Sequence, residues 1–152
     1  MIPAGIGDRV VDFYEHKLYG ALYPVHAGHM ITRWWARPGL LVGGSIIDAA
    51  DYKHLYTDLG IRAVINAETE NSDVGKGIER LCQVQVIDNG TPIPREHVLL
   101  TVSFARWALK HAGCLYVHCQ MGGSRGPAFA YAVMRGALGL SAEESIEAIR
   151  SA

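Results

Sequence analysis

The chain has 152 residues, 49% of them apolar, which suits one globular domain with its own core. Its 14 basic and 15 acidic residues leave a net charge of -1, so no overall field draws it to nucleic acid or to an anionic membrane. No apolar stretch approaches the roughly 20 residues of a transmembrane helix, and the N-terminus lacks the pattern of a secretory signal. We expect a cytoplasmic monomer with no nucleic-acid partner and no transmembrane segment.

The first 30 residues show no clean period, although 10–22 ("VVDFYEHKLYGAL") fit a short helix. We interpret residues 1–30 as an N-terminal extension that packs on the domain, and residues 31–152 as the domain itself. Three histidines of the extension have a spacing that metal ligands use, but they lack carboxylate or thiol partners, so no metal is expected: His16, His26 and His29.

From residue 31 onward, short apolar runs alternate with helical patterns, which is typical of an α/β domain with a largely parallel sheet. Strands are predicted at 39–44, 61–67, 82–88 and 114–118. Helices are predicted at 49–59, 95–113, 127–138 and 142–150. The fold class is therefore α/β, with a central sheet of four or five strands flanked by helices.

Two helix ends carry capping signals. Asp48, with Asp51 three residues on, predicts the start of the first helix, and Gly60 its end. Ser141 and Glu144 predict a capping box for the last helix. Among larger side chains, the adjacent tryptophans 34 and 35 are expected to pack in the core and at an edge.

The cysteines are odd in number and show neither a CxxC pair nor zinc spacing, which favours free thiols over a disulfide framework: Cys82, Cys114 and Cys119. Cys119 differs from the others because it lies in a strand–loop–helix segment, "VHCQMGGSRGPAF". Backbone amides converge on one point in such a segment, and the helix dipole adds positive potential there. An anion is therefore expected to bind, and the same potential favours the Cys119 thiolate.

Three further features of this loop fit an anion site. Glycines 122 and 123 let the backbone turn its amides inward. Arg125, six residues after Cys119, can offer a planar fork to two phosphate oxygens. His118 adds charge beside the thiol.

The segment "HCQMGGSR" resembles the HCxxxxxR signature loop of the cysteine-dependent, dual-specificity protein phosphatases, and the resemblance extends over about residues 31–150. It implies that Cys119 is the nucleophile, that Arg125 binds the phosphate, and that no cofactor is needed. It also implies a phosphate-binding loop made of seven further residues: His118, Gln120, Met121, Gly122, Gly123, Ser124 and Gly126.

The resemblance further implies a general acid on a loop about thirty residues before the cysteine. Asp88 lies 31 residues before Cys119, at a predicted strand end, in a loop with glycine and two prolines. We predict that Cys119 attacks phosphorus while Asp88 protonates the leaving oxygen, and that Asp88 then activates the water that hydrolyses the phosphocysteine. Glu96 is the next candidate acid, although its place in a helix's first turn favours a role toward the helix dipole.

One position departs from the family. Where the family has Ser or Thr after the arginine, this chain has Gly126, so the hydroxyl that stabilises the departing thiolate is missing. We predict slow breakdown of the phosphocysteine.

The substrate stays open at this stage. The predicted activity is hydrolysis of phospho-Tyr, Ser or Thr in proteins, with a lipid or small phosphate ester as the alternative. The variable loop positions are uncharged, which disfavours highly anionic substrates, whereas "FYEHKLYGALY" followed by "RWW" is loosely similar to phosphatidylglycerophosphate phosphatases. A phosphate-binding module without turnover and a rhodanese-like enzyme are the other readings.

Overall fold

The computed structural model describes residues 22–24, 30–90, 92–120 and 123–151. The strands in this part of the chain are β1 (Leu22–Pro24), β2 (Met30–Arg37), β3 (Leu40–Gly43), β4 (Ile61–Asn66), β5 (Leu81–Gln83) and β6 (Cys114–His118). The helices are α2 (Ala49–Leu59), α3 (Arg95–His111), α4 (Arg125–Gly136) and α5 (Ala142–Ser151).

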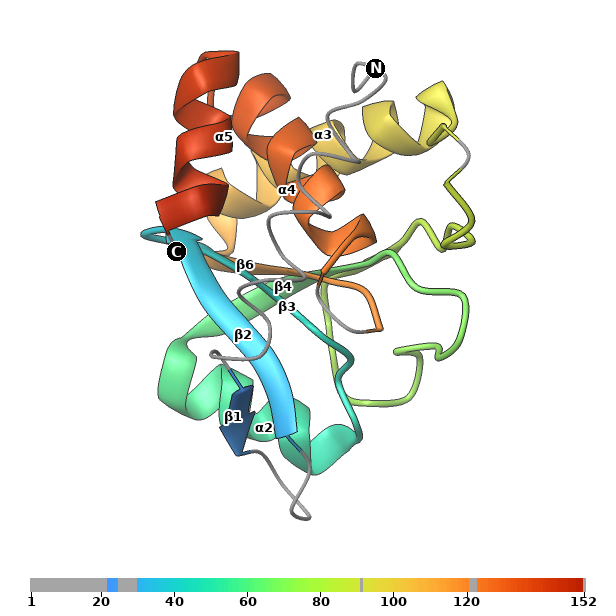
Figure 1. The fold of residues 1–152 in the computed structure, drawn as a ribbon. Helices are drawn as coiled ribbons and strands as arrows, with labels where there is room; N and C mark the ends of the chain where they lie inside the picture. The colour runs from blue at the N-terminus through green and yellow to red at the C-terminus, as the bar shows by residue number, and fades with distance from the viewer. Residues whose placement is uncertain (1–21, 25–29, 91, 121–122, 152) are drawn as a thin grey trace.

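The strands form one sheet in the order β1-β2-β3-β6-β4-β5. The pairs β3–β6, β6–β4 and β4–β5 are parallel, whereas β1–β2 and β2–β3 are antiparallel. Figure 1 shows α3, α4 and α5 stacked over one face of this sheet, with α2 on the opposite face. The result is a three-layer α/β architecture in which β6 runs through the middle of the sheet.

The predicted α/β class and mostly parallel sheet are confirmed. The predicted strands correspond to β3, β4, β5 and β6, but β2 was not predicted, and it adds an antiparallel edge through its pairing with β3. Strand β5 is shorter than the predicted 82–88. Beyond Gln83 the backbone only follows the end of β4, because the amides of Val84 and Val86 donate to the carbonyls of Asn66 and Ala67.

The four helices predicted from residue 49 onward are present, and the capping signals of the first and the last are formed. The Asp48 side chain accepts a hydrogen bond from the Asp51 amide at 2.8 Å, and Gly60 ends α2 with a φ of 73°. The Ser141–Glu144 capping box is formed at the start of α5. The predicted helix at 127–138 starts two residues earlier, at Arg125. The arginine of the signature therefore lies in the first turn of α4.

Alternation along the central strands fills two cores. In β6, Leu115 and Val117 face α3, α4 and α5, whereas Tyr116 faces the α2 side. Phe129 and Met134 of α4 complete the larger core and are fully buried. Helix α4 can be apolar on almost every side because other helices and the sheet surround it.

Gly43, at the end of β3, is a point of close approach. A Cβ placed there would lie 2.3 Å from the carbonyl oxygen of Thr32 and 2.7 Å from the hydroxyl of Tyr116. Its own carbonyl accepts a hydrogen bond from the Cys119 amide at 3.2 Å. Glycine therefore lets β2, β3 and β6 approach one another directly beside Cys119.

The parallel strands end at one edge of the sheet, since Gly43, Asn66 and His118 are register partners. Ligand sites of open α/β sheets lie outside such carboxyl ends. The segments that leave this edge hold the predicted site residues. The helices of the described ranges include none with the length and apolar character to span a bilayer.

The division into an extension at 1–30 and a domain at 31–152 remains a prediction. Of the extension, the structure describes the three residues of β1, which pair with β2, and the first residue of β2. The predicted helix at 10–22 and the three histidines of the extension lie outside the described residues, apart from Leu22, which belongs to β1.

Candidate active site

The candidate nucleophile follows the central strand directly. Cys119 comes directly after the last residue of β6 and is 2% exposed. Its amide donates a hydrogen bond to the Gly43 carbonyl. On the other side of the strand, the Ala67 amide donates to the carbonyl of His118 at 2.8 Å. The neighbouring parallel strands thus fix the backbone on both sides of the thiol.

The loop after Cys119 leads into α4. Gln120 is exposed, and its carbonyl accepts a hydrogen bond from the Ser45 amide at 3.1 Å. Gly123 and Ser124 are partly exposed and precede the first turn of the helix. Met121 and Gly122 lie outside the described residues, so the predicted convergence of the loop amides stays a prediction.

Gly126 lies directly against the thiol. A Cβ at this position would be 3.4 Å from the sulfur of Cys119, which is ordinary contact distance. A side chain at this position would therefore touch the sulfur. In this chain the sulfur has no hydroxyl neighbour from that position.

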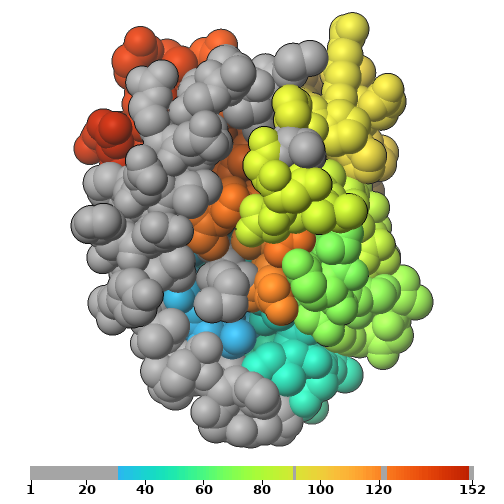
Figure 2. Space-filling view, turned by 45° about the vertical axis from the view of Figure 1, so that its right-hand side comes forward, coloured from blue at the N-terminus to red at the C-terminus, as the bar shows by residue number. Residues whose placement is uncertain are grey.

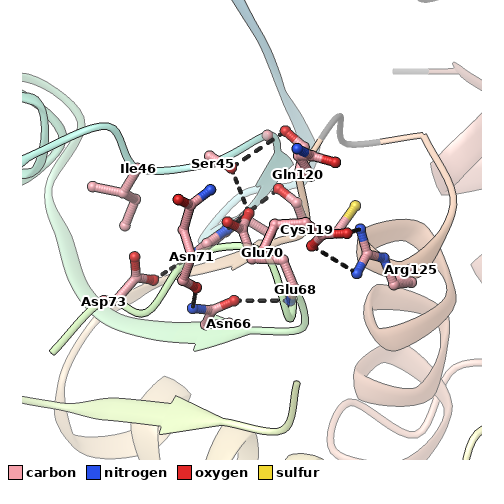
Figure 3. Close-up of polar contacts among 12 residues, drawn as sticks. Ser45, Ile46, Asn66, Glu68, Glu70, Asn71, Asp73, Cys119, Gln120 and Arg125 are labelled. Carbon is pink, nitrogen blue, oxygen red and sulfur yellow. Dashed lines mark hydrogen bonds and ion pairs between the residues drawn. The ribbon is translucent and has the colours of Figure 1, made fainter. Parts of the chain in front are cut away.

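Arg125 is buried and points back toward Cys119, as Figure 3 shows. Its Nη1 and Nη2 donate to the carboxylate of Glu70 at 3.0 and 2.9 Å, and Nη1 also donates to the Val86 carbonyl at 2.9 Å. Nε is buried and has no hydrogen-bond partner among the described residues. Burial would lower the pKa of this guanidinium, but Glu70 and the nearby Cys119 and Asp88 raise it above its usual range.

Asp88 lies at the mouth of the site with its side chain 50% exposed. One carboxylate oxygen is 4.0 Å from the Nε of Arg125, and the other accepts a hydrogen bond from the Ser124 hydroxyl at 3.2 Å. In Figure 2 the orange atoms at the start of α4 are visible between the green and yellow-green loops that carry Glu70 and Asp88. Glu96, the alternative acid, lies exposed in the first turn of α3.

The structure therefore brings Cys119, Arg125 and Asp88 to one edge of the sheet. A buried thiol, a buried guanidinium with one N–H unpaired among the described residues, and a half-exposed carboxyl group lie at the start of one helix. Such a set can hold a tetrahedral oxyanion and offer it a nucleophile and a proton donor.

No model of a protein family matches the chain, and no curated protein matches it. The chain is, however, similar to solved structures. Human DUSP28 is 21% identical to this chain, with a TM-score of 0.69 over 79% of this chain and 80% of the other. PTPMT1, in a complex with PI(5)P, is 22% identical, with a TM-score of 0.68 over 78% and 81%.

A mouse putative dual specificity phosphatase, complexed with zinc tungstate, is 22% identical, with a TM-score of 0.66 over 79% of this chain and 74% of that one. The chain has the dual-specificity phosphatase fold. The resemblance seen in the sequence is thus confirmed at the level of fold, over nearly four fifths of the chain.

The sequence did not predict a role at the site for the acidic residues of the loop after β4. That loop, read only as a polar connection, supplies Glu70 to Arg125, and it supplies Glu68 and Asp73 to the imidazole of His118. The available signal was three carboxylates in a loop that leaves the carboxyl end of a parallel strand.

A buried ion pair supports the same edge from the α2 side. Arg33 of β2 donates to both oxygens of Asp51 at 2.9 and 2.7 Å, and its Nε donates to the Tyr116 hydroxyl at 3.1 Å. Another N–H of Arg33 reaches the Ser45 carbonyl at 3.1 Å. Asp51, which the sequence placed only in the cap of α2, therefore joins β2 to that helix.

None of the cysteines in the described residues forms a disulfide. Burial raises the pKa of Cys82 to about 11, so this thiol stays protonated at neutral pH. The described residues include no group of three or more His, Cys, Asp or Glu side chains that could hold a metal ion.

Proposed function

We propose that the protein is a phosphomonoester hydrolase of the dual-specificity phosphatase type, which acts through a phosphocysteine intermediate. The fold and its neighbours support a phosphatase. The observation that carries the proposal is the unused, buried Nε–H of Arg125, beside the Cys119 thiol and 4.0 Å from Asp88. A buried guanidinium donor without a partner is costly unless a ligand satisfies it, and a phosphate oxygen is the acceptor that such a fork prefers.

In the proposed reaction, the Cys119 thiolate attacks phosphorus, and the bond to the leaving oxygen breaks as Asp88 transfers its proton to that oxygen. Water then attacks the phosphocysteine, Asp88 takes a proton from it, and the thiolate of Cys119 departs. Arg125 keeps contact with the equatorial oxygens in both steps, which favours the transition state because the contact strengthens as charge develops. Glu70 holds two other donors of Arg125 and so leaves Nε to face the substrate.

We propose phosphorylated Tyr, Ser or Thr in proteins as the substrate. A lipid or other small phosphate ester is the second candidate, because one of the similar structures is a complex of PTPMT1 with PI(5)P. Acidic side chains around the site, among them Glu70 and Asp88, disfavour a substrate with several phosphates through like-charge repulsion. A monomeric state and a cytoplasmic location remain predictions from the sequence.

Hydrolysis of a small aryl phosphate by three proteins tests the proposal. Wild type should be active, Cys119→Ser inactive, and Asp88→Asn strongly slowed, with a smaller loss for aryl groups that leave easily. The last comparison identifies the acid, because a good leaving group does not need the proton. Activity that survives in Cys119→Ser would refute nucleophilic catalysis, and an inactive wild type that binds vanadate would favour a phosphate-binding module.

The same variants separate the candidate substrates. Cys119→Ser should trap a phosphopeptide more tightly than it binds vesicles that contain a phosphomonoester lipid. Release of phosphate by wild type from the vesicles, and not from phosphopeptides, would favour the lipid alternative.

A further inference from the structure

A buried cluster of charged groups lies beneath the candidate nucleophile and outside the set that would contact phosphorus. It consists of His118, Glu68, Asp73 and Lys76, and the last three all come from the loop between β4 and β5. Figure 3 shows Glu68 and Asp73 to the left of Cys119, on the side away from Arg125. The phosphatase mechanism uses none of these groups directly.

The imidazole of His118 is 0% exposed and has a carboxylate at each nitrogen. Its Nε2 lies 2.5 Å from an oxygen of Asp73, and its Nδ1 lies 3.5 Å from an oxygen of Glu68. A neutral imidazole carries one N–H, so it could donate to only one of them. The two carboxylates therefore favour the doubly protonated, positively charged ring.

Both carboxylates are fixed by other contacts. Asp73 accepts a hydrogen bond at 2.9 Å from Lys76, whose ammonium also donates to the Ile46 carbonyl at 2.5 Å. Glu68 accepts one at 2.5 Å from the hydroxyl of Ser45. Their side chains are 0% exposed, so solvent does not screen their charges from the ring.

The charges of the cluster are balanced only when the ring holds its second proton. Two carboxylates then face two cations, His118 and Lys76. With a neutral ring, the cluster would keep one negative charge in a buried place beside Cys119, where it would oppose a second negative charge on the sulfur. Burial alone would lower the pKa of His118, but the contacts with Asp73 and Glu68 raise it above its ordinary value.

The other group that faces the ring does not supply a competing charge. The Tyr116 ring is stacked on the imidazole at a centroid distance of 5.3 Å. Its hydroxyl contacts Arg33, and burial raises its pKa, so it remains neutral. The charge of Arg33 is itself paired with Asp51. The carbonyl of Cys119 lies 3.4 Å from Nδ1 and carries no net charge.

We propose that Asp73 and Glu68 are positioning residues, which lock a permanent positive charge on His118 next to Cys119 and thereby keep the thiol ionised at neutral pH. The loop between β4 and β5 would then act on the nucleophile without touching the substrate. The inference deepens the proposed phosphatase function, but its tests do not require turnover.

The first test measures the rate of Cys119 alkylation by iodoacetamide against pH, with mass spectrometry to assign the modified cysteine. Wild type should react fully below pH 7. In Asp73→Asn the profile should move up by about one pH unit, so that the rate falls by roughly threefold to fivefold near the wild-type midpoint and by about tenfold well below it. Asp73→Glu retains the carboxylate and should restore most of the rate.

Glu79→Gln is the matched control. It removes a carboxylate from the same loop, but the Glu79 side chain is 85% exposed and contacts Arg80, so the profile should stay that of wild type. A folded Asp73→Asn protein with the wild-type profile would overturn the proposal. An equal shift in Glu79→Gln would overturn it too, because the effect would then be general to the charge of the loop.

The second test uses wild-type protein, so it does not depend on whether a variant folds. Nitrogen NMR of the imidazole of His118, assigned by its loss in His118→Asn, should show both nitrogens protonated at pH 7.5. A neutral ring at that pH would refute the proposal. If the ring is charged and the alkylation profile responds as expected, but wild type fails to hydrolyse aryl phosphates, the proposed function fails and this inference stands.

Discussion

Arg125 donates hydrogen bonds from its two terminal nitrogens to the carboxylate of Glu70, at 3.0 and 2.9 Å, while its Nε has no hydrogen-bond partner among the described residues. This fork-to-fork pair fixes the plane of the guanidinium. Because an arginine with a free side chain must lose rotamer freedom to bind a ligand, the pair lowers the entropic cost of phosphate binding.

The Glu70–Arg125 pair therefore predicts a binding defect in Glu70→Ala. We expect KM for an aryl phosphate to rise by roughly tenfold to a hundredfold, from the usual strength of a hydrogen bond to a charged group, with a smaller change in kcat. Glu79→Gln, in the same loop, should behave as wild type. A lower KM in Glu70→Ala would instead show that Glu70 competes with the phosphate for Arg125.

Gly126 predicts the kinetic course of the reaction. Since residue 126 has no hydroxyl to place against the sulfur, thiolate departure should limit turnover, and wild type should release a burst of aryl alcohol equal to the enzyme concentration. Gly126→Ser should raise kcat and abolish the burst. Gly126→Ala is the control, because it places only a Cβ at 3.4 Å from the sulfur. A wild-type trace without a burst would contradict the prediction.

The sequence predicted the helices and the parallel strands well because each has its own local signal. Asp48, Gly60 and the Ser141–Glu144 box set helix ends that the structure reproduces within the same residues. Strand β2 was not predicted because its pattern, "MITRWWAR", contains Arg33, which is buried. The burial of an arginine can be predicted only when its partner, here Asp51, is known.

The residues of the site also differ in whether a local sequence pattern could predict their contacts. Cys119 and Arg125 belong to one continuous motif, so their proximity is local. The contacts of His118 with Glu68 and Asp73 join residues 45 or more positions apart, and no local pattern encodes such pairings. Tertiary pairings of this kind depend on the strand order, which the sequence did not reveal.

The buried pair of Arg33 and Asp51 predicts an asymmetric effect on stability. Replacing Asp51 with Asn leaves a buried guanidinium without its counter-charge, so the free energy of unfolding should fall by about 3–5 kcal/mol. The double variant Arg33→Met, Asp51→Leu should be less destabilised than Arg33→Met alone or Asp51→Leu alone, because it leaves no uncompensated charge. Urea unfolding at pH 7 measures wild type, these two single variants and the double variant. Additive single effects would contradict a coupled pair.

The raised pKa of His118 predicts how stability depends on pH. A histidine that binds its proton more tightly when folded stabilises the protein fully below the unfolded pKa, about 6.5. That contribution is lost as the pH rises through the folded pKa. The free energy of unfolding should therefore decline with pH above about 6.5 in wild type, and this decline should be smaller in Asp73→Asn. Equal slopes in both proteins would count against a charged His118.

The close packing around Gly43 predicts which positions a library of random variants will find intolerant to substitution. It supplies no chemistry, yet a Cβ there would collide with the Thr32 carbonyl and the Tyr116 hydroxyl, while its own carbonyl restrains the amide of Cys119. A methyl group would push two neighbouring strands apart and tilt the sulfur away from Arg125. Screens for lost turnover should thus return position 43 beside the nucleophile itself, although nothing there ever meets a substrate.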